Sequence, residues 1–108
     1  MISNAAFRQM ALALPGVQEQ PHFNLASFRV HNKIFATLWE ADRKAMLKLT
    51  PVEQSVYCSY NSHVFYPVPG GWGAKGATFV NLNAVAKEVL AEALQTAFNG
   101  AGRAKRDS

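Results

Sequence analysis

The stretch Pro67-Val-Pro-Gly-Gly-Trp-Gly-Ala-Lys-Gly-Ala-Thr78 organises the chain, because it holds four of the seven glycines and lies between two strand-like runs. Val64-Phe65-Tyr66 precedes it and Thr78-Phe79-Val80 follows it. A glycine-rich segment between two such runs is typical of a hairpin tip, where the backbone turns through positive φ angles. The sequence therefore predicts a hairpin here, with Trp72 and Lys75 held out from the body of the fold.

Further strands and helices are predicted on both sides of this hairpin. Runs that alternate or are mostly apolar predict three more strands, at residues 27–30, 33–39 and 45–49. Apolar residues at helical spacing predict three helices, at about 4–14, at 51–60 and from Asn81 or Asn83 to Phe98. Short turns join neighbouring strands, so the order α-β-β-β-α-β-β-α predicts a two-layer α+β domain, an antiparallel sheet with helices on one face.

Local signals predict where these elements begin and end. Ser3 can cap the first helix, and Thr50-Pro51-Val52-Glu53 predicts a capping box with proline at the first helical position. The segment 17–25 is expected to be a loop, and His31-Asn32 a tight turn between two strands. Asn99-Gly100 is expected to close the last helix. Residues 1–100 would then form a single domain, followed by a disordered basic tail at 101–108.

Composition narrows the class of protein. The chain has 108 residues, of which 49% are hydrophobic, which predicts one folded domain with an ordinary core. The only cysteine is Cys58, so no disulfide can form within the chain. The sequence shows neither a signal-peptide pattern nor an apolar run of about 18 residues, which predicts a cytoplasmic protein without a membrane span. We expect a monomer or a weak dimer.

The net charge of +4 permits contact with nucleic acid. Several cations fall on predicted strands or turns, and a tryptophan near them could stack on a base or a sugar. The predicted DNA-contacting residues, which would act on the phosphate backbone through hairpin loops, are Lys33, Arg43, Lys44, Trp72 and Lys75. The competing interpretation is a solvated surface, because lysines at strand edges also prevent edge-to-edge pairing of sheets.

An alternative function is a module that binds a small ligand or a protein. It would use the sheet face opposite the helices together with the glycine-rich tryptophan loop. The residues considered for that face are Phe28, Phe35, Thr37 and Trp39, and the predicted binding residues are Phe35, Trp39 and Trp72. The competing interpretation is that the loop at 17–25 folds over this face.

Enzymatic chemistry has little support in the sequence. Gly71-x-Gly73-x-x-Gly76 matches a dinucleotide-binding string, but a strand follows it where that motif needs a helix. Cys58 is expected to be a buried, inert thiol, and Glu19 with His22 a hydrogen bond that fixes a loop. The three histidines, His22, His31 and His63, are scattered in sequence. We therefore predict no catalytic residue, no metal and no cofactor.

Several segments together resemble a known family. They are Leu14-Pro15-Gly16-Val17 with Glu19 and His22-Phe23, Ser27-Phe28-Arg29-Val30 with Lys33-Ile34-Phe35-Ala36, Met46-Leu47-Lys48-Leu49, and Gly71-Trp72-Gly73 with Lys75-Gly76-Ala77-Thr78. The chain resembles the MmcQ/YjbR-like proteins over nearly its whole length. The resemblance implies an antiparallel sheet with helices on one side and DNA binding through a double-wing arrangement, without catalysis. In a common form of that family a His-Trp pair follows the loop lysine, whereas here Gly76-Ala77-Thr78-Phe79 follows Lys75.

Overall fold

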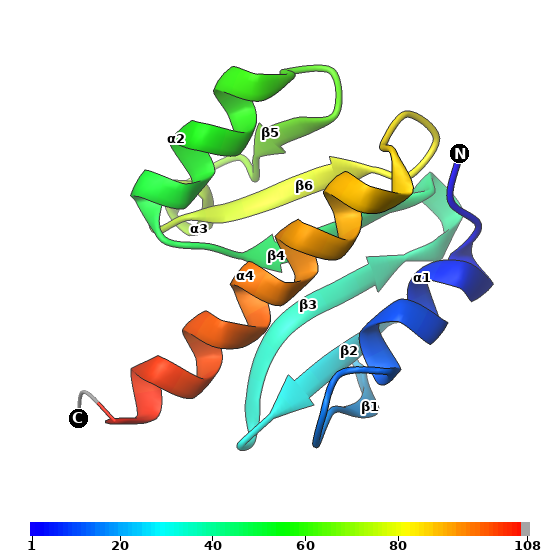
Figure 1. Ribbon diagram of the computed structural model, residues 1–108, viewed down its shortest axis with the longest axis vertical. Coiled ribbons are helices and arrows are strands. Elements are labelled where there is room, and N and C mark those ends of the chain that lie inside the picture. The colour runs from blue at the N-terminus through cyan, green and yellow to red at the C-terminus, as the bar shows by residue number, and fades with distance from the viewer. Residues whose placement is uncertain (107–108) are drawn as a thin grey trace.

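A six-stranded antiparallel sheet forms one layer of the computed structural model, which describes the backbone of residues 1–106 (Figure 1). In spatial order its strands are β1 (Gln18–His22), β2 (Leu25–Val30), β3 (Lys33–Trp39), β4 (Lys44–Lys48), β6 (Ala77–Asn81) and β5 (Phe65–Pro67). The second layer consists of helices on one face of the sheet, α1 (Asn4–Leu12), α2 (Pro51–Tyr60) and α4 (Lys87–Arg106). Two short turns complete the fold, η1 (Glu40–Asp42) and α3 (Gly71–Ala74). The predicted two-layer α+β architecture is confirmed.

The helix layer and the sheet enclose a core built around aromatic pairs. Phe7 of α1 meets Phe28 of β2 edge to face at 5.6 Å, and Tyr57 of α2 lies 4.9 Å from Phe65 of β5. Such pairs add to the stability that their buried area already gives. The apolar face predicted for the first helix therefore meets the sheet, as Phe7 shows.

Strand β1 replaces the loop predicted at 17–25, so that prediction is wrong. The strand pairs with β2 along its length, from Gln18 opposite Arg29 to His22 opposite Leu25. Its sequence, Gln-Glu-Gln-Pro-His, has no apolar alternation, because an edge strand can pair through its backbone without burying a side-chain face. The tight turn predicted at His31-Asn32 is confirmed, since both residues have positive φ angles of 55° and 62°.

The glycine-rich stretch does connect two antiparallel strands, β5 and β6, but it is packed closely against the body of the fold. A Cβ atom on Gly73 would lie 1.7 Å from the Val68 carbonyl oxygen, and one on Gly76 would lie 1.9 Å from that of Leu49. The side chain of Gln54 on α2 donates hydrogen bonds to the carbonyl oxygens of Gly73 and Ala77. Glycine is needed here for close backbone approach as well as for turning.

The last helix begins and ends later than predicted. It starts at Lys87, because the Asn81 side chain accepts a hydrogen bond from the backbone N–H of Asn83 and holds that segment in a turn. It passes through Asn99-Gly100 to Arg106, so the predicted end is wrong, and the helix enters the segment expected to be a disordered tail. The rest of that segment, 107–108, lies outside the described residues.

The capping box of α2 is confirmed, and it supports a prediction. The Thr50 hydroxyl accepts from the Glu53 N–H at 3.1 Å, and the Glu53 carboxylate accepts from the Thr50 N–H at 2.9 Å. Thr50→Ala removes the hydroxyl acceptor, so we expect the free energy of unfolding to fall by about 1 kcal/mol in urea denaturation. Thr50→Ser keeps the acceptor and is expected to match the wild type. Equal stability of the alanine and serine variants would contradict a role for the cap.

Candidate functional site

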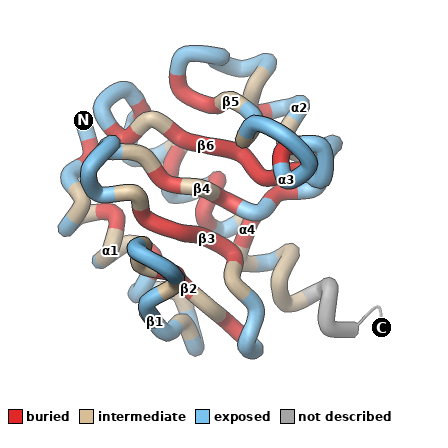
Figure 2. The backbone as a smooth tube through the Cα atoms, turned by 180° about the vertical axis from the view of Figure 1, so that it is seen from behind, coloured by how far each residue is buried: buried red, intermediate tan, exposed pale blue. Residues whose placement is uncertain are grey.

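The sheet face opposite the helices is the candidate site. Figure 2 shows this face from behind, with β3, β4 and β6 toward the viewer and the helices α1 and α4 on the far side. Residue pairing across the sheet defines its members, since Thr37 lies opposite Met46, Met46 opposite Phe79, and Phe79 opposite Tyr66. We call this surface the open face, and its residues are Arg29, Thr37, Trp39, Lys44, Met46, Lys48, Tyr66 and Phe79.

A lysine and three aromatic rings form a cluster on the open face, toward the end where Trp39 pairs with Lys44. The Lys44 ammonium nitrogen lies 3.9 Å from the centre of the Phe79 ring and 5.2 Å from that of Trp39. Trp39 meets Phe79 edge to face at 5.1 Å, and Tyr66 lies 5.6 Å from Phe79 on the other side. The Trp39 indole donates a hydrogen bond of 2.9 Å to the Thr37 hydroxyl, which fixes the orientation of its ring. The arrangement is a rigid aromatic platform that carries a cation.

The charge on the open face has one sign. Its strand positions hold Arg29, Lys44 and Lys48, and none of its residues is Asp or Glu. Two carboxylates next to these strands, Glu19 and Glu40, are directed to the other layer, where they accept hydrogen bonds from Arg8 of α1. The bond to Glu19 raises the pKa of the Arg8 guanidinium, so Arg8 keeps its charge. The open face is therefore positive, which favours anionic ligands.

The five residues predicted to contact DNA do not form one cluster. Lys33 begins β3, whereas Lys44 pairs with Trp39 at the other end of that strand, about 20 Å away by the rise of a strand. Arg43 precedes Lys44, and Lys75 lies near the opposite end, where Ala77 pairs with Lys48. Lys44 therefore lies on the aromatic platform at one end of the open face and Lys75 lies near the other end, whereas Lys33 lines a groove beside α4.

The three residues predicted for ligand binding do not share one surface. Phe35 is fully buried and meets Phe98 of α4 edge to face at 5.8 Å, so its predicted place on the exposed face is wrong. The cause is a β-bulge, since Phe28 lies opposite Ala36 but Arg29 lies opposite Ile34, which leaves Phe35 as the extra residue. Trp39 is on the open face. Trp72 is 67% exposed on α3, as the sequence predicted for the loop.

Sequence reasoning missed two members of the aromatic platform, Phe79 and Tyr66. The alternation of β6 indicates that Phe79 has the opposite orientation to Thr78 and Val80. It does not indicate which strand lies beside β6, and the neighbour is β4, far away in sequence. The link from Trp39 through Phe79 to Tyr66 depends on that non-local pairing.

The residues considered for other chemistry remain apart. Within the described part of the chain, no group of three histidine, cysteine or acidic residues could hold a metal ion. Burial raises the pKa of the Cys58 thiol, which makes it a poor nucleophile at neutral pH. Glu19 bonds to Arg8 on α1, and His22 instead has a ring contact with Phe23, because positions 19 and 22 of a strand point to opposite faces.

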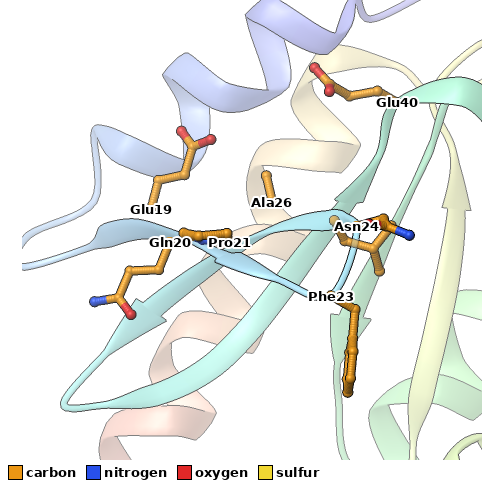
Figure 3. Close-up of a pocket in the computed structure, with 8 residues that line it drawn as sticks. Glu19, Gln20, Pro21, Phe23, Asn24, Ala26 and Glu40 are labelled. Atoms are coloured by element: carbon orange, nitrogen blue, oxygen red, sulfur yellow. The ribbon is translucent and has the colours of Figure 1, made fainter.

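A concavity of about 530 Å³ lies beside the β1–β2 hairpin (Figure 3). Glu19 and Glu40 lie on its α1 side, and Phe23 points away from them. Both carboxylates already accept hydrogen bonds from Arg8, at 3.0 and 3.2 Å. The hydrogen bonds of Arg8 thus connect one side of this groove to α1.

Comparison with known proteins identifies the family of this chain. The YjbR family model matches residues 12–99. The chain belongs to the YjbR family. The predicted resemblance to MmcQ/YjbR-like proteins is thus confirmed. No match was found among curated proteins.

A YjbR-type fold is also found among solved structures. The chain is similar to the crystal structure of Deinococcus radiodurans protein DR2400, which has a DUF419 domain, with a TM-score of 0.77 and 19% sequence identity. The similarity covers 91% of this chain and 77% of that chain, and it shows a shared fold. Among residues 1–106 of this YjbR-family chain, no helix has the length and apolar character needed to cross a bilayer.

Proposed function

We propose that this YjbR-family domain binds DNA without catalysis, and that the open face contacts the phosphate backbone. The observation that supports the proposal is the Lys44 ammonium held over Phe79 and Trp39, on a face that also carries Arg29 and Lys48 and no carboxylate. Lysine and arginine side chains neutralise phosphates and release condensed counterions, which makes binding favourable and dependent on salt.

The spacing of the cations fits a polymer that lies along the sheet. Lys48 and Lys75 lie near one end of the open face, and Arg43 and Lys44 lie near the other, about 13 Å away by the rise of β4. A duplex presents phosphates repeatedly over that distance. The platform adds a second contribution, because the half-buried rings of Trp39 and Tyr66 can stack only with unpaired bases. The proposal therefore predicts binding to both forms of DNA, and tighter binding to a single strand.

The decisive experiment is fluorescence anisotropy of labelled single-stranded and duplex oligonucleotides at several salt concentrations. Lys44→Gln removes the charge and leaves a shorter, uncharged polar side chain, so we expect weaker binding to every DNA sequence. The slope of log affinity against log salt should fall by about 1. Lys87→Gln, at the exposed start of α4, is the matched control and is expected to leave binding unchanged.

A chain that ends at Gly102 separates the folded domain from the basic C-terminal residues. We expect it to retain salt-dependent binding, because the proposed contacts lie on the sheet. The proposal fails if no salt-dependent binding occurs, if Lys44→Gln binds like the wild type, or if removal of residues 103–108 abolishes binding.

A further inference from the structure

Helix α2 exposes an apolar stripe on the side away from the sheet. Val52 is 74% exposed, Val56 62% and Tyr60 61%. Their spacing of four residues places them on one face of the helix. The neighbouring side of the helix is occupied, since Tyr57 packs on Phe65. Contiguous exposed apolar side chains on a small domain often mark an interaction surface.

The stripe borders a groove of about 460 Å³ that is also lined by α4. We call it the α2–α4 groove, and its lining residues are Val52, Glu53, Val56, Tyr57, Tyr60, Glu92 and Thr96. The Tyr57 and Thr96 hydroxyls lie 3.3 Å apart, and Thr96 also donates to the Glu92 carbonyl oxygen at 3.0 Å. Burial raises the pKa of Tyr57, so its phenol is neutral at physiological pH. The groove thus has an apolar wall and an uncharged, hydrogen-bonded floor.

The charge of the groove is opposite to that of the open face. Among the side chains that the structure describes, its lining includes Glu53 and Glu92 and no Lys or Arg, and Glu88 lies one turn before Glu92 on α4. Glu92 and Glu88 are both exposed. An apolar stripe beside carboxylates complements a helix that has apolar residues on one side and basic residues next to them.

We propose that the α2–α4 groove binds a basic amphipathic helix of a partner protein. Apolar residues about one turn apart in that helix contact Val52, Val56 and Tyr60, and flanking Lys or Arg side chains meet Glu92 and Glu88. A second copy of this chain fits poorly, because a symmetric contact would bring the same carboxylates together. The carboxylates also disfavour nucleic acid at this site. The proposal is independent of the open face, which lies on the other layer.

Site-specific photocrosslinking in the native host tests the proposal. A photoreactive phenylalanine derivative replaces Val56 in the full chain, and the same residue at Asn83, an exposed loop position, is the matched control. We expect a crosslink from position 56 alone, to a partner segment with helical apolar spacing and flanking Lys or Arg residues. A peptide of that segment should bind the purified chain, and Val56→Asp or Glu92→Lys should each weaken its affinity by about tenfold.

A charge exchange separates a direct contact from a general loss of structure. Changing the facing Lys of the peptide to Glu should restore affinity for Glu92→Lys and weaken affinity for the wild-type chain. Three outcomes overturn the proposal: no crosslink above that at Asn83, a crosslink to a second copy or to an acidic segment, or a peptide affinity that neither variant changes. Unchanged thermal unfolding of both variants confirms that they remain folded.

Discussion

Gly76→Ala is expected to lower the free energy of unfolding by more than about 3 kcal/mol. The added Cβ would lie 1.9 Å from the Leu49 carbonyl oxygen and 2.8 Å from its carbon, where the backbone cannot move without separating two elements. Gly76 also has a φ of +113°, a conformation that an L-residue rarely adopts. A loss of this size removes much of the stability of a typical domain. Urea denaturation followed by tryptophan fluorescence measures it.

Two neighbouring glycines provide matched controls. Gly70 also has a positive φ, +86°, but a Cβ there would meet nothing within 4 Å. Gly70→Ala therefore tests backbone strain without the clash, and we expect a loss of about 1 kcal/mol. Gly71 has neither constraint, so Gly71→Ala should match or slightly exceed the wild type. Equal destabilisation by Gly76→Ala and Gly70→Ala would show that close packing against Leu49 does not hold this segment in place.

Phe35→Ala is expected mainly to lower stability, and Trp39→Ala mainly to weaken DNA binding. Phe35 is fully buried against α4, so its truncation should lower the free energy of unfolding by about 3–5 kcal/mol. The molecules that remain folded should bind DNA with unchanged affinity. Trp39 is half-buried on the open face, and Trp39→Ala should cost less stability. It should weaken binding to single-stranded DNA by about 1–3 kcal/mol, the contribution of one stacked base.

Anisotropy at a temperature where both variants are folded measures the binding, and urea denaturation measures the stability. Phe35→Leu is the control, because it keeps a large apolar side chain and should lose less stability than Phe35→Ala. Weakened DNA binding by folded Phe35→Ala would contradict the placement of Phe35 on the helix side. Unchanged binding by Trp39→Ala would show that base stacking on Trp39 does not contribute to affinity, and that only phosphate contacts do.

Local signals in the sequence were enough to predict most of the fold. The Thr50 capping box, the Ser3 cap and the turn at His31-Asn32 each depend on hydrogen bonds or dihedral angles within a few residues, and all three are present. Strand β1 was missed because its pairing with β2 uses backbone groups, which the side-chain pattern does not report. The start of α4 was misplaced because Asn81 forms a turn with Asn83 at the position where a helix cap was expected.

The site was less predictable, because it depends on which strands become neighbours. Lys44 and Trp39 face each other across a short connection, but Phe79 joins them only because β6 pairs with β4. The orientation of Phe35 depends on a one-residue bulge between β2 and β3. A strict alternation along β3 would place Phe35 with Trp39, which is the error that the sequence analysis made.

The open face and the α2–α4 groove differ in their local charge. The open face carries Arg29, Lys44 and Lys48, whereas Glu88 and Glu92 lie on α4 in the opposite layer. In the field of a polyanion such a domain rotates before contact, so that its positive side arrives first and fewer encounters are lost to wrong orientations. Added salt would then slow association more than dissociation. A domain oriented in this way leaves the α2–α4 groove exposed, so that the groove can bind a protein while the open face contacts the polyanion.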